Sequence, residues 1–153
     1  QFGQNVLADE TDYVLVLERP LKGDEVDPIR HRPLLLLIRQ SDGRLALAKR
    51  NDKAVMCASC GGLFGDPFVG ITVKPQSFII DHFGGSGWRW ERRAQFNYSR
   101  RDNTWQLVRA EQASFHVGDP DARKLEVFVP PKDYGKIDIA DFDPDDFLGK
   151  GPK

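Results

Sequence analysis

Apolar and polar residues alternate most regularly between Trp88 and Ser99. Apart from Arg92, the even positions carry apolar or aromatic residues, and the odd positions carry charged or polar ones: Trp88, Trp90, Ala94, Phe96 and Tyr98 against Arg89, Glu91, Arg93, Gln95, Asn97 and Ser99. A period of two predicts an antiparallel strand with one buried face and one solvated face. Because Trp88 and Trp90 share the apolar face, we expect them to lie inside, between two sheets, and to hold the glycine-rich segment 84–87 outward.

Other strand-forming segments lie on both sides of this strand. Runs of branched and aromatic residues at 13–17, 34–38, 71–73, 78–80, 105–117 and 125–129 are separated by turn residues. Almost no segment has a helical period. The pattern predicts an all-β fold, an antiparallel two-sheet sandwich or flattened barrel built from hairpins.

Three hairpins have a predicted register. The expected opposed pairs are Ile38 with Leu47 and Arg39 with Ala46 around Asp42-Gly43, Val73 with Phe78 and Ile71 with Ile80 around Pro75-Gln76, and Tyr98 with Leu107 in the third hairpin. Arg109 and Glu111 interrupt the apolar face of the last strand, so they either pair with each other or mark a bulge or a wet pocket.

The chain of 153 residues is expected to form a single domain, with strands within 11–129 and a tail over 130–153. Asp143 followed by Pro144 and two acids predicts one short C-terminal helix, with Asp143 as its N-cap. Phe142 and Phe147 would anchor it.

Charge and hydropathy exclude two classes of function. The net charge of −1 argues against a general nucleic-acid binder, which needs a clear positive excess. An arginine cluster (Arg89, Arg92, Arg93, Arg100, Arg101) and an acidic cluster (Asp138, Asp141, Asp143, Asp145, Asp146) predict two solvated faces that attract each other weakly. The longest apolar run, 34–38, is too short for a membrane helix. Because the first residue is Gln1, any signal peptide or lipid anchor would lie outside this sequence.

Cys57 and Cys60 are the only cysteines. A zinc site would need two further paired ligands, and a redox pair would need a helix in a βαβ setting. Free thiols also remain open. We favour a structural disulfide of an exported protein, which would hold the turn that presents residues 61–68.

No catalytic group or metal site is predicted. The Gly-Gly-Ser-Gly-Trp sequence at 84–88 has Trp88 where a nucleophile elbow needs glycine, and it leads into a strand. It also lacks the lysine of a phosphate-binding loop. Asp66 is expected in a turn and Asp81 and His82 on a strand. A hydrolase would need these three side chains to converge in one cleft.

The glycine-rich segment has two remaining interpretations. It either forms a bulge where the chain bends between sheets, or it forms a thin loop that enters a partner's cleft with little loss of entropy. The second interpretation predicts a partner-binding site at Gly85, Ser86, Gly87, Trp88 and Arg89.

Several motifs together resemble those of a group of small exported bacterial proteins. They are Cys57-Ala58-Ser59-Cys60-Gly61-Gly62, Gly65-Asp66-Pro67-Phe68, Gly84-Gly85-Ser86-Gly87-Trp88-Arg89-Trp90 and Phe96-Asn97-Tyr98. The strand at 12–17 resembles the end of an FG-GAP-like opening, and the resemblance spans residues 12–115. Related proteins include immunity lipoproteins of bacterium-killing type IV secretion systems, which are similar to periplasmic lysozyme inhibitors.

The resemblance implies a periplasmic, non-enzymatic immunity protein that inhibits a peptidoglycan-degrading enzyme by inserting the loop at 85–87. It implies no cofactor, although calcium is a further candidate at Asn5, Asp9, Glu10 and Asp12. The alternatives are an uncharacterised structural lipoprotein domain and a carbohydrate- or peptidoglycan-binding module, in which Trp105 or Tyr98 would be exposed platforms.

Overall fold

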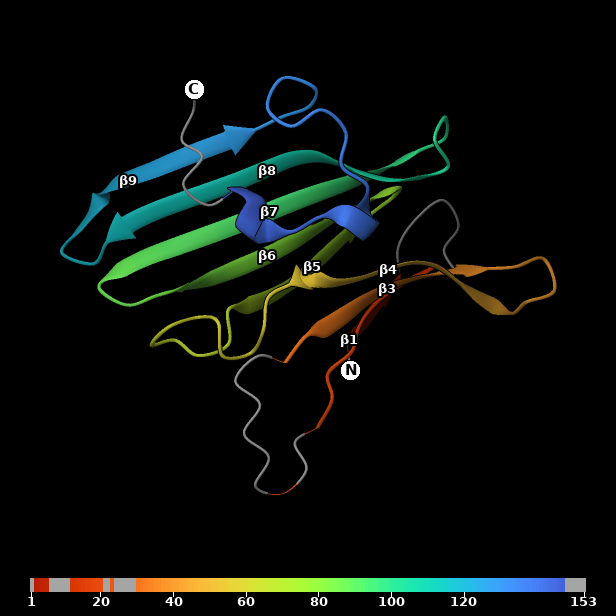
Figure 1. Ribbon diagram of the computed structural model, residues 1–153, viewed down its shortest axis with the longest axis horizontal. Coiled ribbons are helices and arrows are strands. Elements are labelled where there is room, and N and C mark those ends of the chain that lie inside the picture. The colour runs from red at the N-terminus through yellow and green to blue at the C-terminus, as the bar shows by residue number, and fades with distance from the viewer. Residues whose placement is uncertain (1, 6–11, 21–22, 24–29, 148–153) are drawn as a thin grey trace.

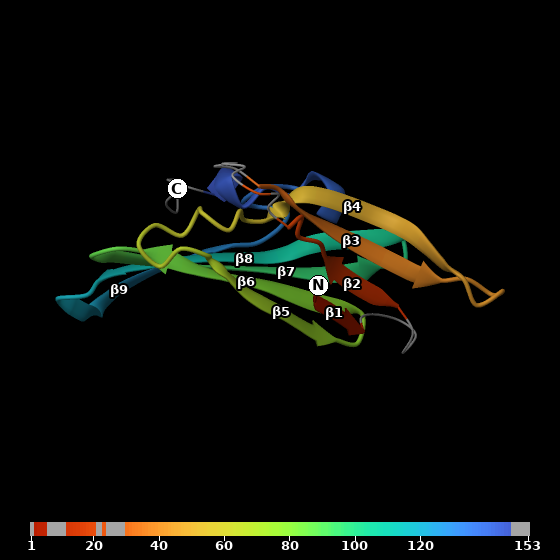
Figure 2. The ribbon, with the colours of Figure 1, turned by 90° about the horizontal axis from the view of Figure 1, so that it is seen from below.

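The computed structural model describes residues 2–5, 12–20, 23 and 30–147 and shows an all-β sandwich (Figures 1 and 2). The small sheet contains, in this order, β1 (Phe2–Asn5), β2 (Tyr13–Val16), β3 (Arg32–Arg39) and β4 (Leu45–Val55). The large sheet contains β5 (Phe68–Lys74), β6 (Ser77–Gly85), β7 (Trp88–Ser99), β8 (Thr104–His116) and β9 (Asp119–Phe128). Neighbouring strands are antiparallel in both sheets, which confirms the predicted fold class.

The first two predicted registers have different outcomes. Val73 opposes Phe78 and Ile71 opposes Ile80, as predicted. In the β3–β4 hairpin, Ile38 opposes Ala46, one residue from the predicted partner. The reason is a longer turn, in which the N–H of Gly43 donates to the carbonyl of Gln40 and Gly43 has φ 84°. A bulge beside Leu36 absorbs the offset.

The β7–β8 register is also shifted from the prediction. Tyr98 opposes Trp105 because the turn occupies residues 100–103, with Asn103 at φ 51°. A bulge beside Gln95 then directs Arg109 and Glu111 to the outer face of the large sheet, where their side chains form an ion pair. Both predictions for this arginine and this glutamate, pairing and a bulge, are confirmed.

The core does not form around the two predicted tryptophans. Phe78 and Phe96 stack at its centre with ring centroids 5.1 Å apart, and both are fully buried. Trp88 is 63% exposed and Trp90 is half-buried, so the predicted burial of the pair is wrong. Trp88 begins β7 at the end of the large sheet that lies away from β3 and β4 (Figure 1). The buried tryptophan is Trp105.

The C-terminal segment covers the middle of the large sheet's inner face, the face toward the small sheet. It forms two 3-10 turns, η1 (Ile139–Asp141) and η2 (Pro144–Phe147). Phe142 and Phe147 are buried as predicted, and a carboxylate oxygen of Asp143 accepts the N–H of Asp145 at 3.0 Å. The predicted helix is therefore present as a single 3-10 turn, and η1 was not predicted.

Asn51 on β4 anchors the C-terminal segment by hydrogen bonds. Its amide nitrogen donates to the carbonyls of Ile139 at 2.6 Å and Phe142 at 2.7 Å, and its amide oxygen accepts the N–H groups of Lys53 and Ala54. Arg92 of the predicted arginine cluster and Asp145 of the predicted acidic cluster form an ion pair, with nitrogen and oxygen 2.9 Å apart. No helix within the described residues has the length and apolar character needed to cross a membrane.

Candidate functional site

The tip of the β6–β7 hairpin is docked against the turn that contains the two cysteines. The N–H of Gly85 donates to the carbonyl of Gly61 at 2.9 Å, and the N–H of Leu63 donates to the carbonyl of Gly85 at 3.1 Å. On the other side, the carbonyl of Gly87 accepts the N–H of Val117 at 2.9 Å. The hairpin tip is thus held by backbone hydrogen bonds from two neighbouring segments.

Cys57 and Cys60 form a disulfide, as predicted. It closes the start of a turn that continues with hydrogen bonds from Gly61 N–H to Gly65 carbonyl at 2.8 Å and from Gly65 N–H to Gly62 carbonyl at 3.0 Å. We call residues 57–65 the stapled turn. The disulfide and the hydrogen bonds preorganise its conformation, which lowers the entropy cost of binding through it.

The close approach between turn and hairpin requires glycines. A Cβ on Gly62 would lie 2.8 Å from the carbonyl oxygen of Gly85, and a Cβ on Gly84 would lie 2.4 Å from Cζ2 of Trp90. Both distances are shorter than van der Waals contact. Gly84 and Gly85 therefore serve the docking of the backbone, and the exposed part of the tip is Ser86 and Gly87.

An exposed surface surrounds this tip, and we call it the tip patch: Leu63, Phe64, Ser86, Gly87 and Arg89. Leu63 is 86% exposed and Phe64 is 47% exposed. The rings of Phe64 and Phe83 meet edge-on, with their centres 5.6 Å apart. The guanidinium of Arg89 lies over the Phe64 ring, 3.9 Å from the ring centre. Arg89 forms no ion pair with any described carboxylate, and its Nε has no hydrogen-bond partner. The patch combines apolar anchors with one half-buried cation that forms no ion pair with a described residue.

The structure brings only part of the predicted binding set together. Gly85 is largely committed to the stapled turn, and strand alternation places Trp88 and Arg89 on opposite faces of the large sheet. Trp88 contacts His116 edge-on at 5.3 Å, whereas Arg89 contacts Phe64. Sequence reasoning missed Leu63 and Phe64. Their available signal was two large apolar residues enclosed by glycines directly after the cysteine pair.

His82 supports the hairpin from inside. It is 4% exposed, and its Nε2 accepts the backbone N–H of Met56 at 3.1 Å. Burial, and then the nearby positive charge of Arg92, lower the pKa of His82 to about 4. The imidazole is therefore neutral at neutral pH, and it accepts a hydrogen bond from the residue that directly precedes the stapled turn.

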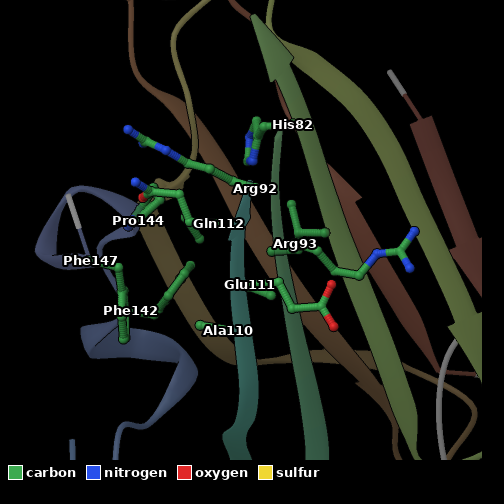
Figure 3. A pocket seen from close by; sticks show the side chains of 12 residues that line it. His82, Arg92, Arg93, Ala110, Glu111, Gln112, Phe142, Pro144 and Phe147 are labelled. Carbon is green, nitrogen blue, oxygen red and sulfur yellow. The ribbon is translucent and has the colours of Figure 1, made fainter. Parts of the chain in front are cut away.

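A small cavity of about 20 Å³ lies beside His82, between the large sheet and η2 (Figure 3). Arg92 and Gln112 point toward η2 at its wall, near Pro144. Arg92 Nε and Gln112 Oε1 are out of contact with solvent and have no partner. A cavity of this size has room for about one water molecule, so it is too small for a substrate.

The three side chains that a hydrolase would need do not converge. Asp81 and His82 are consecutive in β6 and lie on opposite faces of the sheet. Asp81 pairs with Arg93 at 2.7 Å on the outer face. Asp66 binds buried Arg32 through both oxygens, at 2.8 Å and 2.5 Å. Burial acts to raise the pKa of Asp66, but the hydrogen bonds from Arg32 and from the Phe68 N–H, together with the charge of Arg32, outweigh burial and lower this pKa.

The outer face of the large sheet contains a broad hollow of about 490 Å³. Its lining includes the apolar residues Val69, Phe83, Ala113 and Leu125. Its charged residues form ion pairs. Asp81 pairs with Arg93 and Glu91 with Arg123 within the lining, whereas Glu111 pairs with Arg109 and Arg92 with Asp145, both outside it. These pairs leave the hollow without an unpaired charge that would orient a small ligand.

The remaining predicted sites are the calcium candidate and the two aromatic platforms. Within the described ranges, no group of three or more potential metal ligands is found. For the calcium candidate, Asp9 and Glu10 lie outside the described residues, and Asp12 accepts the N–H of Arg39 at 3.0 Å. Trp105 is 3% exposed and packs against half-buried Tyr98, so neither ring is an open platform. No protein-family model, curated protein or solved structure matches the chain.

Proposed function

We propose that this protein is a non-enzymatic binding protein that blocks a peptidoglycan-degrading enzyme of the lysozyme type with its tip patch. The observation that carries the proposal is the 86% exposure of Leu63 on a turn that is stapled and docked against the hairpin tip. A large apolar side chain held rigidly in water is typical of an anchor residue in a protein–protein interface.

The shape of the tip favours insertion into a cleft. Ser86 and Gly87 are the exposed end of the hairpin and carry little side-chain bulk, so this end is narrow. Leu63 and Phe64 lie beside it and supply apolar contact area, and Arg89 supplies charge. Such a tip matches a partner with a deep, acidic cleft and an apolar rim, which agrees with the resemblance to lysozyme inhibitors.

The disulfide supports an exported, periplasmic location as part of the same proposal. Disulfides persist in oxidising compartments and are rare in a reducing cytosol. The Cys57–Cys60 bond is placed where it rigidifies the proposed contact surface. A cell-wall hydrolase acts in the same compartment, so an inhibitor there would meet its target.

The proposal is tested by measuring how the protein affects a panel of lysozyme-type muramidases in a cell-wall clearing assay. We expect inhibition that saturates with inhibitor concentration and is abolished by Leu63→Asp and by Ser86→Arg. Leu47→Asp is the matched control, because Leu47 is 56% exposed but lies on β4. Absence of inhibition across the panel, or equal inhibition by Leu63→Asp and Leu47→Asp, would overturn the proposal.

A further inference from the structure

One end of the large sheet's inner face is left open by the described residues. The small sheet lies over the opposite end and the two 3-10 turns lie over the middle, so the first residues of β7, the last of β8 and the first of β9 have neither in front of them (Figure 1). The register places Ser114 beside Trp90 and Lys124, and Gln112 beside Arg92 and Glu126, on this inner face. Gln112 and Arg92 mark the inner boundary of the open end, because both line the cavity beneath η2.

Trp88 is the most exposed aromatic ring of this open end. Its indole is 63% exposed and meets the imidazole of His116 on the neighbouring strand at 5.3 Å, with the rings 71° apart. His116 is itself held, because its Nδ1 accepts the N–H of Gly118 at 3.1 Å. The indole is therefore supported at its side while much of its surface remains in water.

Polar groups without partners extend from this ring along β8 and β9. Within the described part of the chain, no hydrogen bond or ion pair engages the Ser114 hydroxyl, the Lys124 ammonium or the Glu126 carboxylate. The open end thus offers one stacking surface together with both donors and acceptors.

This combination selects one class of ligand. Trp88 is the one tryptophan of this end whose ring is mostly exposed. One exposed ring is too little for an amphipathic helix, which needs a continuous apolar groove. Lys124 and Glu126 balance each other's charge, which disfavours a polyanion such as nucleic acid. A pyranose ring has a face of C–H groups that stacks on an aromatic ring and a rim of hydroxyls that both donate and accept hydrogen bonds.

We propose that the open end binds a saccharide chain, with Trp88 stacking on one sugar ring and Ser114, Lys124 and Glu126 hydrogen-bonding hydroxyls of the sugars that follow this ring along β8 and β9. This site is separate from the tip patch, because Trp88 and Arg89 lie on opposite faces of the sheet. The inference therefore goes beyond the proposed inhibition of an enzyme, and the two functions depend on different residues. A protein with both sites would bind cell-wall glycan and remain where a cell-wall hydrolase acts.

The test is a titration of the whole chain with chitohexaose, cellohexaose and soluble peptidoglycan fragments, followed by calorimetry and by amide chemical-shift mapping. We expect saturable binding of at least one saccharide, with dissociation constants on the order of 1 mM or tighter. The shifted amides should cluster at residues 88–90, 112–116 and 124–126.

Variants then separate the two sites. Trp88→Ala should weaken saccharide affinity about tenfold or more, and Trp88→Phe should retain part of it. Leu63→Asp should leave saccharide affinity unchanged while it removes enzyme inhibition. No binding of any of the three saccharides, or shifts in the wild-type protein that map elsewhere, would overturn the proposal. The wild-type map decides the question even if Trp88→Ala does not fold.

Discussion

The guanidinium carbon of Arg89 lies 3.9 Å from the centre of the Phe64 ring. This contact joins the first residues of β7 to the stapled turn by side chains, in addition to the backbone hydrogen bonds at Gly85. It also places the charge of Arg89 at the edge of an exposed apolar surface. The tip patch is therefore one surface built from two segments that are more than twenty residues apart in the chain.

A double-mutant cycle should detect this contact. Arg89→Ala and Phe64→Ala together should cost less stability than the sum of the single variants, with a coupling energy of about 0.5–1 kcal/mol. The measurement is the free energy of unfolding in urea. A control cycle of Arg109→Ala with Phe64→Ala should give no coupling, because Arg109 pairs with Glu111. Equal coupling in both cycles would contradict the contact.

The disulfide should stabilise the fold by a modest amount because its loop is short. Cys57→Ala/Cys60→Ala should lower the free energy of unfolding by about 2 kcal/mol through the loss of loop-closure entropy in the unfolded chain. Reductant should cause a similar loss in the wild-type protein and none in the variant, as measured by denaturant midpoints. A variant that remained sensitive to reductant would exclude this explanation.

Two glycines of the hairpin should respond differently to alanine. Gly84→Ala places a Cβ 2.4 Å from Cζ2 of Trp90 and 2.9 Å from the carbonyl oxygen of Gly61. Overpacking of this kind should destabilise the protein by about 1–3 kcal/mol. Gly87→Ala meets only the His116 side chain, at 3.3 Å, and should be nearly neutral. Thermal unfolding of the two variants under the same conditions compares them directly.

Asn51 should be among the most sensitive polar residues of the small sheet. Asn51→Ala leaves two buried carbonyls and two N–H groups without partners, which should cost about 3 kcal/mol. Amide exchange in residues 139–147 should accelerate in the same variant. Asp52→Ala serves as the control, because its ion pair with Arg50 is on the surface and should contribute less than about 1 kcal/mol. Comparable losses in both variants would argue against the anchoring role of Asn51.

His82 should make the protein less stable as pH falls. The ordinary pKa of histidine is 6.5, and burial lowers the pKa of His82 in the folded protein to about 4. Between these values the unfolded chain binds a proton that the folded protein does not, so stability falls as pH drops from 6.5 to about 4. The full loss is about 3 kcal/mol.

Urea unfolding at several pH values checks this dependence. His82→Gln, whose amide oxygen replaces Nε2 as an acceptor, should show a shallower loss of stability over this pH range. His116→Gln is the control and should retain the wild-type slope, because His116 is exposed. Asp66 contributes loss at lower pH in both variants, since the hydrogen bond from Arg32 lowers its pKa. Identical pH slopes of the unfolding free energy in His82→Gln and His116→Gln would contradict the role of His82 in this pH dependence.

The sequence by itself determined the local features of this protein. Alternation along β7, the β5–β6 register and the 3-10 turn after Asp143 depend on residues that are close in the chain. The same holds for the disulfide, because Cys57 and Cys60 are three residues apart. Turn length and bulges were less predictable, and they shifted two registers by one or two residues.

Only the tertiary structure decided which faces of the strands are covered. The alternation of Trp88 and Trp90 predicts a shared face, but burial of that face depends on how far the small sheet extends over the large one. The small sheet does not reach Trp88, so the residue expected in the core is exposed. Leu63 and Phe64 likewise became part of the tip patch through hydrogen bonds between distant backbone segments, which no local pattern encodes.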